Sequence, residues 1–131
     1  MRVYRVLFAQ FAAALVLSIA DIYFGINRSY YYYYWWFDIL THFLGGMWAG
    51  LFCIWLLSKR NRPASFWLWL TGVLIIGVGW ELFEAGTGLT EFPADTFDTV
   101  KDIFVDVAGA LSVYFTAAFF GRRSPGDILR K

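Results

Sequence analysis

The single histidine of this chain lies one helical turn after an aspartate, inside the apolar stretch WWFDILTHFLGG. Asp38 and His42 are spaced i, i+4, so a helix places both side chains on one face, about 6 Å apart along its axis. A carboxylate beside an imidazole can accept a proton or supply two metal ligands. Because ionisable groups are rare in so apolar a setting, this pair indicates a site.

More carboxylates follow at helical spacing. Glu81 and Glu84 are spaced i, i+3 in the stretch GWELFEAG, so they also share a helix face. Asp98, Asp102 and Asp106 form a ladder that drifts only about 40° around the helix per step. Three segments therefore carry acidic side chains that can converge on one layer of a helical bundle.

The segments that must position these residues are long and apolar. The chain has 131 residues, of which 60% are hydrophobic, 22% aromatic and 16% charged. A soluble domain has about 25% charged residues, whereas a helix that crosses a bilayer needs roughly 20 apolar ones. The sequence predicts one transmembrane domain over residues 1–131, an all-α membrane bundle of four helices. These helices are expected at about 6–24, 35–57, 66–83 and 100–120.

The first apolar stretch has an alternative interpretation. Arg2 and Arg5 precede it, and Ser18-Ile19-Ala20 resembles the small-residue cleavage site of a secretory signal peptide. Because the chain retains the segment, we interpret it as the first membrane span.

The basic residues are segregated, which predicts the orientation of the bundle. Nine of the eleven lie before the first stretch, between the second and third, or after the fourth. Short loops rich in Lys and Arg stay cytoplasmic, so both termini are predicted to be cytoplasmic and the protein to lie in the cell (inner) membrane. Nine of the ten acids then belong to the outer half. The nine basic residues are Arg2, Arg5, Lys59, Arg60, Arg62, Arg122, Arg123, Arg130 and Lys131, whereas Arg28 and Lys101 lie on the outer side.

The free energy of burial indicates that the acids face inward. An aspartate near the bilayer centre costs roughly 2.5–3.5 kcal/mol. If Glu81, Asp102 and Asp106 all faced lipid, the cost would be roughly 8–10 kcal/mol, comparable with the whole stability of a domain. Within the spans and their caps, Lys101 is the only basic partner for six or seven carboxylates. We therefore expect a bound cation, protons or both.

Structural roles account for part of this pattern. Thr99 and Asp102 match a capping box, and Asp95 or Asp98 can cap the fourth helix. Capping does not reach Asp106, two turns into the helix.

Other acids and the histidine have alternatives too. Asp38 and Glu84 can be solvated at the membrane surface. A lone histidine in a helix is often an ordinary hydrogen-bonded core residue. The carboxylates near His42 favour a functional role instead.

Three motifs in order resemble the VanZ-like superfamily of small integral membrane proteins, and most closely its uncharacterised branches. They are FDILTHFLGG, GWELFEAG and DTFDTVKDIFVDVAGA, and they extend over residues 38–110. The stretch ADTFDTVKD can be aligned with the family's acidic motif in two ways. The ladder is then either Asp95, Asp98 and Asp102 or Asp98, Asp102 and Asp106. The resemblance implies a cell-envelope role, since the namesake is associated with glycopeptide resistance, but it brings no established activity. The residues that match the motif pattern of this superfamily are Asp38, His42, Gly46, Trp80, Glu81, Glu84, Asp98, Thr99, Asp102 and Asp106.

The first functional hypothesis is a metal-dependent hydrolase, or a binding pocket, at the outer leaflet. Oxygen ligands with one imidazole suit Mg²⁺, Mn²⁺, Fe²⁺ or Ca²⁺, with Zn²⁺ as an alternative. Such an ion would polarise a phosphoryl or ester oxygen of a lipid-linked envelope substrate. The expected metal ligands are His42, Glu81, Glu84, Asp98, Asp102 and Asp106, and the expected catalytic residues are Asp38, His42, Glu81 and Asp102.

Two other classes stay open. Carboxylates and a histidine inside a membrane also serve cation or proton transporters, although the other half of each span lacks a matching polar trail. In a non-catalytic membrane module, a structural cation would only hold the helices together. The expected partners are membrane lipids and a lipid-linked substrate. Nucleic acid is not an expected partner, because the chain has no basic patch for it.

Overall fold

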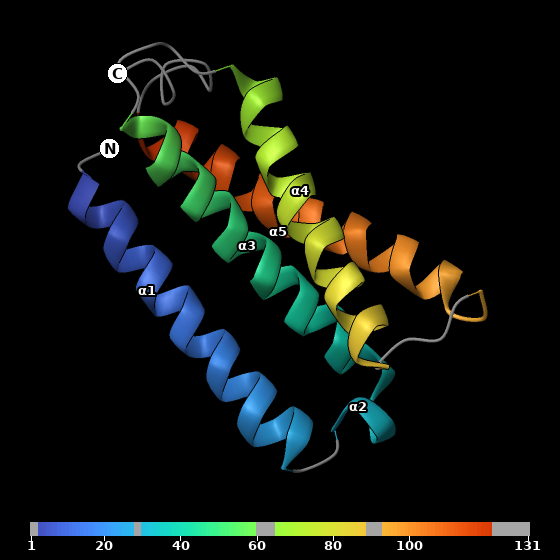
Figure 1. Cartoon of the computed structure of the whole chain (residues 1–131). Coiled ribbons are helices and arrows are strands. Elements are labelled where there is room, and N and C mark those ends of the chain that lie inside the picture. The colour runs from blue at the N-terminus through green and yellow to red at the C-terminus, as the bar shows by residue number, and fades with distance from the viewer. Residues whose placement is uncertain (1–2, 28–29, 60–64, 89–92, 122–131) are drawn as a thin grey trace.

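The computed structural model describes residues 3–27, 30–59, 65–88 and 93–121, and in this part of the chain every regular element is helical (Figure 1). Four helices are long and apolar enough to cross a membrane, with mean hydropathy between 1.5 and 1.7 over the spans. The all-helical prediction with four such helices is confirmed. The elements are α1 (Val3–Ile19), the π-helical η1 (Ala20–Ile26), α2 (Tyr30–Tyr33), α3 (Trp35–Ser58), α4 (Phe66–Thr87) and α5 (Thr96–Gly121).

The helices α4 and α5 extend four residues beyond one end of the apolar stretches that predicted them. The helix α4 continues from residue 83 to Thr87 and ends where Gly88 takes a left-handed backbone conformation with φ of 77°. The helix α5 begins four residues before residue 100, at Thr96, whose hydroxyl donates to the carbonyl of Pro93 at 2.9 Å. Apolar composition indicates which residues lie within the hydrocarbon core of a membrane, whereas local hydrogen bonds and capping residues decide where a helix begins and ends.

Many of the charged residues used to predict the orientation lie outside the described residues. The structure therefore describes the helices but says nothing of these side chains. They are Arg2, Arg28, Arg60, Arg62, Glu91, Arg122, Arg123, Asp127, Arg130 and Lys131.

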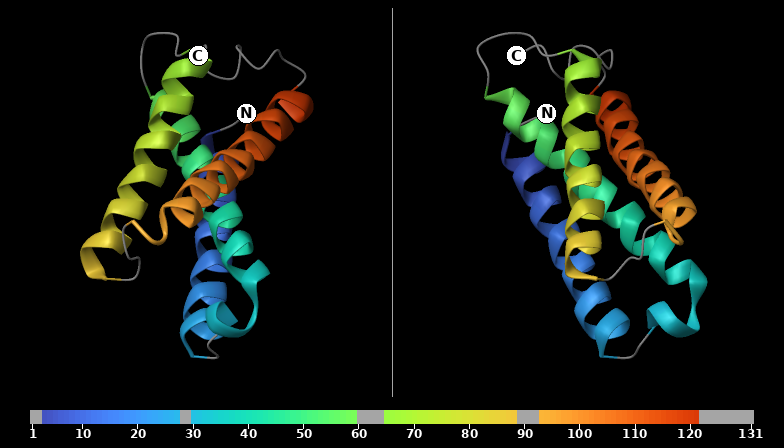
Figure 2. Two further views of the ribbon diagram at one scale, coloured as in Figure 1. Left: turned by 90° about the vertical axis from the view of Figure 1, so that its right-hand side faces the viewer. Right: turned by 45° about the vertical axis from the view of Figure 1, so that its right-hand side comes forward.

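The helix α3 is central and packs against α1, α4 and α5 (Figures 1 and 2). One end of the bundle, where α3 ends, α4 begins and α5 ends, contains the main apolar core. There Trp69 is fully buried, its ring lies 4.7 Å from that of Tyr114, and its indole N–H donates to the carbonyl of Gly50 at 3.1 Å. We call the opposite end, where α3 begins, the polar end.

Glycines let α3 and α5 approach to backbone contact. A Cβ atom added at Gly46 would overlap the backbone carbonyl of Asp106, and one added at Gly109 would overlap the carbonyl of Phe43. Such close approach is the usual reason for small residues between membrane helices. It brings the aspartates of α5 against the histidine face of α3.

Candidate functional site

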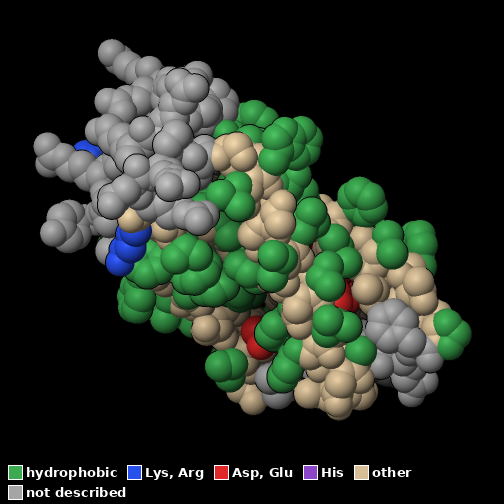
Figure 3. Space-filling view, turned by 45° about the horizontal axis from the view of Figure 1, so that its top comes forward, with side chains coloured by type: hydrophobic (Ala, Val, Ile, Leu, Met, Phe, Trp, Pro, Cys, Tyr) green, Lys and Arg blue, Asp and Glu red, His purple; other side chains and the backbone are tan. Residues whose placement is uncertain are grey.

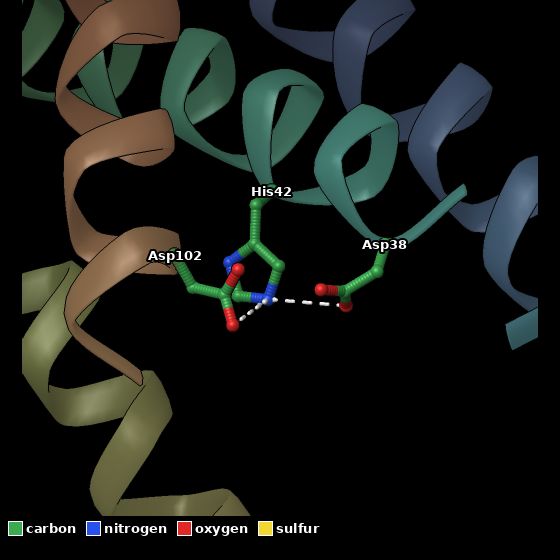
Figure 4. A group of neighbouring side chains, drawn as sticks. All are labelled: Asp38, His42 and Asp102. Carbon is green, nitrogen blue, oxygen red and sulfur yellow. Dashed lines mark ion pairs between the residues drawn. The ribbon is translucent and has the colours of Figure 1, made fainter. Parts of the chain in front are cut away.

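His42 lies at the centre of a buried polar cluster. Its side chain is 7% exposed, and its Nδ1 atom lies 3.3 Å from Oδ1 of Asp106 on α5. Its Nε2 atom lies 3.7 Å from Oδ1 of Asp38 and 3.7 Å from Oδ2 of Asp102 (Figure 4). Both ring nitrogens thus face carboxylates, because the i, i+4 spacing on α3 supplies one neighbour and the glycine contact with α5 supplies the others.

The helix α4 adds two glutamates to this cluster. Glu81 is 3% exposed, and neither of its carboxylate oxygens has a hydrogen-bond partner among the described residues. Glu84 is half-buried and accepts a 2.9 Å hydrogen bond from the indole N–H of Trp80. One ligand atom from each of His42, Glu81 and Glu84 lies within 4.8 Å of the other two. We call these three residues the glutamate group.

A second set of three residues shares the same imidazole. One ligand atom from each of Asp38, His42 and Asp102 also lies within 4.8 Å of the others. We call these three residues the aspartate group. Lys101 lies beside it, with its Nζ atom 3.0 Å from Oδ2 of Asp38 and 3.2 Å from Oδ1 of Asp102. The ammonium is also 2.5 Å from Oδ1 of Asp98, so one lysine pairs with three carboxylates.

The structure brings most of the predicted site residues together, and the expected buried cluster is confirmed. Asp98 is the exception, since its side chain is 54% exposed and pairs with Lys101 instead. Asp106, also a predicted metal ligand, contacts His42 but like Asp98 belongs to neither group of three. Of the two alternatives for the ladder, Asp106 is the residue beside His42, whereas Asp95 lies in the turn before α5. The residues gathered around the imidazole are Asp38, Glu81, Glu84, Asp102 and Asp106.

Sequence reasoning underestimated two residues at this end. Lys101 was expected only as an insufficient counter-charge, yet it links α5 to Asp38 of α3. Gly77 is not among the predicted site residues, yet a Cβ atom there would lie 3.0 Å from Oδ2 of Asp106. The signal was present, because Gly77 precedes Glu81 by four residues and therefore shares its helix face.

The donor set fits a divalent cation. Among the described residues, one ammonium and one imidazole face six carboxylates at the polar end, which leaves an excess of negative charge. Burying carboxylates together without compensation is strongly unfavourable, so protons or a cation must balance them. On the face shown in Figure 3, acidic side chains appear only as small patches between hydrophobic ones. A cation would gain most at Glu81, which is buried and has no hydrogen-bond partner among the described residues.

Comparison with known proteins identifies a family without an assigned function. No curated protein and no solved structure matches the chain. A family model described as "Predicted membrane protein (DUF2238)" matches residues 2–123. This match agrees with the four apolar helices of a multi-pass membrane protein, and it shows no link to the VanZ-like superfamily. Because the match covers nearly the whole chain, this protein belongs to the DUF2238 family of predicted membrane proteins.

Proposed function

We propose that this protein binds one divalent cation through the glutamate group and presents it to a phosphate-bearing lipid of the outer leaflet. The observation that carries the proposal is Glu81, a carboxylate 3% exposed whose oxygens have no hydrogen-bond partner among the described residues. Two more donors, on His42 and Glu84, lie within ligand distance of it. The VanZ-like motifs support the assignment to the cell envelope.

The donor types restrict the ion. Two carboxylates and one imidazole favour Mg²⁺, Mn²⁺, Fe²⁺ or Ca²⁺, and they also suit Zn²⁺. The free cysteine, Cys53, is buried in the apolar core away from these donors, so the site offers no thiolate. Mn²⁺ is a suitable probe because it accepts both carboxylate and imidazole ligands.

The burial of the side chains supports a pocket that opens at the polar end. Glu81 and Asp102 are buried, whereas the side chain of Asp38 is 28% exposed and Glu84 is half-buried. Toward the other end, the bundle is filled by apolar side chains around Trp69. This arrangement favours a blind pocket over a transporter, because conduction needs polar groups along the whole path.

A groove beside the cluster supports a lipid-linked substrate. It has a volume of about 580 Å³ and lies between α3 and α5. Lys101 lines both this groove and the aspartate group. We propose that the groove holds the hydrocarbon chain of the lipid, so that the head group reaches the cluster beside the ammonium. Its walls include Ile39 and Phe43 of α3 and Phe97, Val100, Lys101 and Phe104 of α5.

The chemistry that best suits these groups is hydrolysis of a lipid diphosphate. A bound divalent cation would polarise a phosphoryl oxygen. Asp38, half-buried at the open end, is placed to accept a proton from water, and Lys101 beside it to contact the negative phosphate. Water adds to the terminal phosphorus, the bond between that phosphorus and the bridging oxygen breaks, and orthophosphate leaves the lipid monophosphate behind.

This function is tested with the purified full chain in detergent. It is expected to bind about one Mn²⁺ per chain and to release phosphate from an isoprenyl diphosphate. Glu81→Gln is expected to lower Mn²⁺ affinity about 100-fold, because a neutral amide replaces the buried carboxylate. Asp98→Asn is the matched control and is expected to keep Mn²⁺ affinity within a few-fold of the wild type, since Asp98 is 54% exposed and belongs to neither group. Electron paramagnetic resonance measures free Mn²⁺ in each titration.

Two results would contradict this proposal at different levels. Wild-type protein that binds no Mn²⁺ would overturn the metal site, and the cluster would then be a network of protons. Mn²⁺ binding without phosphate release would leave a structural cation in a non-catalytic module as the better explanation.

We also propose that both termini are cytoplasmic, which places the polar end outside. Thr87 at the end of α4 and Lys59 at the end of α3 mark opposite ends of the bundle. In a Cys53→Ala background, Thr87→Cys is expected to react with an impermeant maleimide in intact cells, whereas Lys59→Cys reacts only after permeabilisation. The reverse pattern would place the cluster on the cytoplasmic side and exclude an outer-leaflet substrate.

A further inference from the structure

We infer that Lys101 is the resident cation of the aspartate group, and that it thereby restricts the divalent ion to the glutamate group. This inference rests on the proposed metal site, and it assigns different cations to the two groups that share His42. It predicts that loss of the ammonium creates a second divalent-cation site at Asp38, His42 and Asp102.

Each aspartate of the group divides its two oxygens between the ammonium and the imidazole. In Asp38, Oδ2 lies 3.0 Å from Nζ of Lys101, and Oδ1 lies 3.7 Å from Nε2 of His42. In Asp102, Oδ1 lies 3.2 Å from Nζ of Lys101, and Oδ2 lies 3.7 Å from Nε2 of His42. The ammonium therefore interacts with the same two carboxylates that a metal ion in this group would need.

The position of Lys101 is defined by contacts on both sides. The side chain of Lys101 is 29% exposed. Its ammonium pairs with Asp98, three residues earlier on α5, and with Asp38 on α3. A divalent ion between Asp38 and Asp102 would lie close to this ammonium, and two like charges at that distance repel strongly where water is scarce. An unaltered Lys101 should therefore exclude such an ion.

The glutamate group lacks a comparable counter-charge. Glu84 accepts its hydrogen bond from the neutral indole of Trp80, and Glu81 has no hydrogen-bond partner among the described residues. The other basic side chains in the described segments, Arg5 and Lys59, are at the opposite end of the bundle. A divalent ion is thus favoured at the glutamates by their charge and disfavoured at the aspartates by Lys101.

The test is a rescue of Mn²⁺ binding in a double variant. Glu81→Gln alone is expected to show the same loss of about 100-fold in Mn²⁺ affinity, because the glutamate group lacks one carboxylate and Lys101 still fills the aspartate group. Adding Lys101→Gln is expected to restore about one Mn²⁺ per chain, now held by Asp38, His42 and Asp102. Glu81→Gln with Lys101→Arg is the matched control, since the guanidinium keeps the positive charge and should give no rescue.

Circular dichroism and size-exclusion chromatography check that each variant folds. A folded double variant that binds no Mn²⁺ would overturn the role of Lys101 and leave the metal site of the wild type standing. Rescue by Lys101→Arg as well would also overturn it, because charge would not be the cause. Wild-type protein without Mn²⁺ binding would instead contradict the proposed function itself.

A single variant gives a second measurement if the double variant does not fold. With Glu81 intact, Lys101→Gln is expected to raise Mn²⁺ affinity about tenfold, because the ammonium no longer repels an ion bound nearby. Lys101→Arg is expected to leave the affinity as in the wild type. Equal affinities for Lys101→Gln and the wild type would contradict the inference.

Discussion

Replacing His42 with alanine is expected to lower the affinity for Mn²⁺ by about 100-fold or more. The reason is that both candidate ligand groups contain this imidazole, so no alternative set of three donors is left among the described residues. Removing even an indirect partner of a metal typically costs about 10–100-fold in affinity, and a direct ligand should cost at least as much. Titration with Mn²⁺ followed by electron paramagnetic resonance measures the loss.

A neighbouring residue provides the control for this variant. Thr41 precedes His42, is equally buried at 7%, and donates its hydroxyl to the backbone carbonyl of Asp38 at 2.9 Å. Thr41→Ala should alter packing on the same helix turn without removing a ligand, so its Mn²⁺ affinity is expected to stay within a few-fold of the wild type. If His42→Ala also retained wild-type affinity, the imidazole would not be a metal ligand.

Replacing Gly46 with alanine is expected to destabilise the bundle by about 3 kcal/mol or more, at the upper end of typical overpacking costs. The added Cβ atom would overlap the backbone carbonyl of Asp106, and backbone cannot move aside as a flexible side chain can. The helices α3 and α5 must therefore separate, which also moves Asp106 away from His42. Thermal unfolding in detergent measures the stability, and Mn²⁺ titration measures the effect on the site.

Gly79 is the matched control for the Gly46 variant. It lies in the interior of α4, and a Cβ atom added there meets nothing within 4 Å. Gly79→Ala is expected to keep or slightly raise the stability, because alanine favours a helix by about 1 kcal/mol over glycine. If Gly46→Ala were as stable as Gly79→Ala, the two helices would not pack through backbone contact at this point.

Much of the site was predictable because it depends on geometry within single helices. The i, i+4 spacing of Asp38 and His42 and the i, i+3 spacing of Glu81 and Glu84 follow from 3.6 residues per turn, whatever surrounds the helix. The four apolar lengths predicted the spans, and the cost of exposing carboxylates to lipid predicted that they turn inward. These inferences needed no knowledge of how the helices pack.

The choice between neighbouring acids on α5 required the tertiary structure. Asp98, Asp102 and Asp106 lie on nearly the same face, so helical periodicity cannot say which of them contacts His42. The helix α5 comes into backbone contact with α3 at Gly46 and Gly109, and this contact places Asp102 and Asp106 beside the imidazole. Asp98 lies one turn further out, where it remains exposed and pairs with Lys101.

The sequence by itself determined the spans, the polar end and the residue pairs that share a face, because these follow from hydrophobicity and local helix geometry. Only the tertiary structure decided that Lys101 compensates one group of acids while the carboxylate of Glu81 has no hydrogen-bond partner among the described residues. The physical reason is that the rotation and crossing of packed helices depend on side-chain volumes from several segments at once. Charges distant in sequence become neighbours only through that packing.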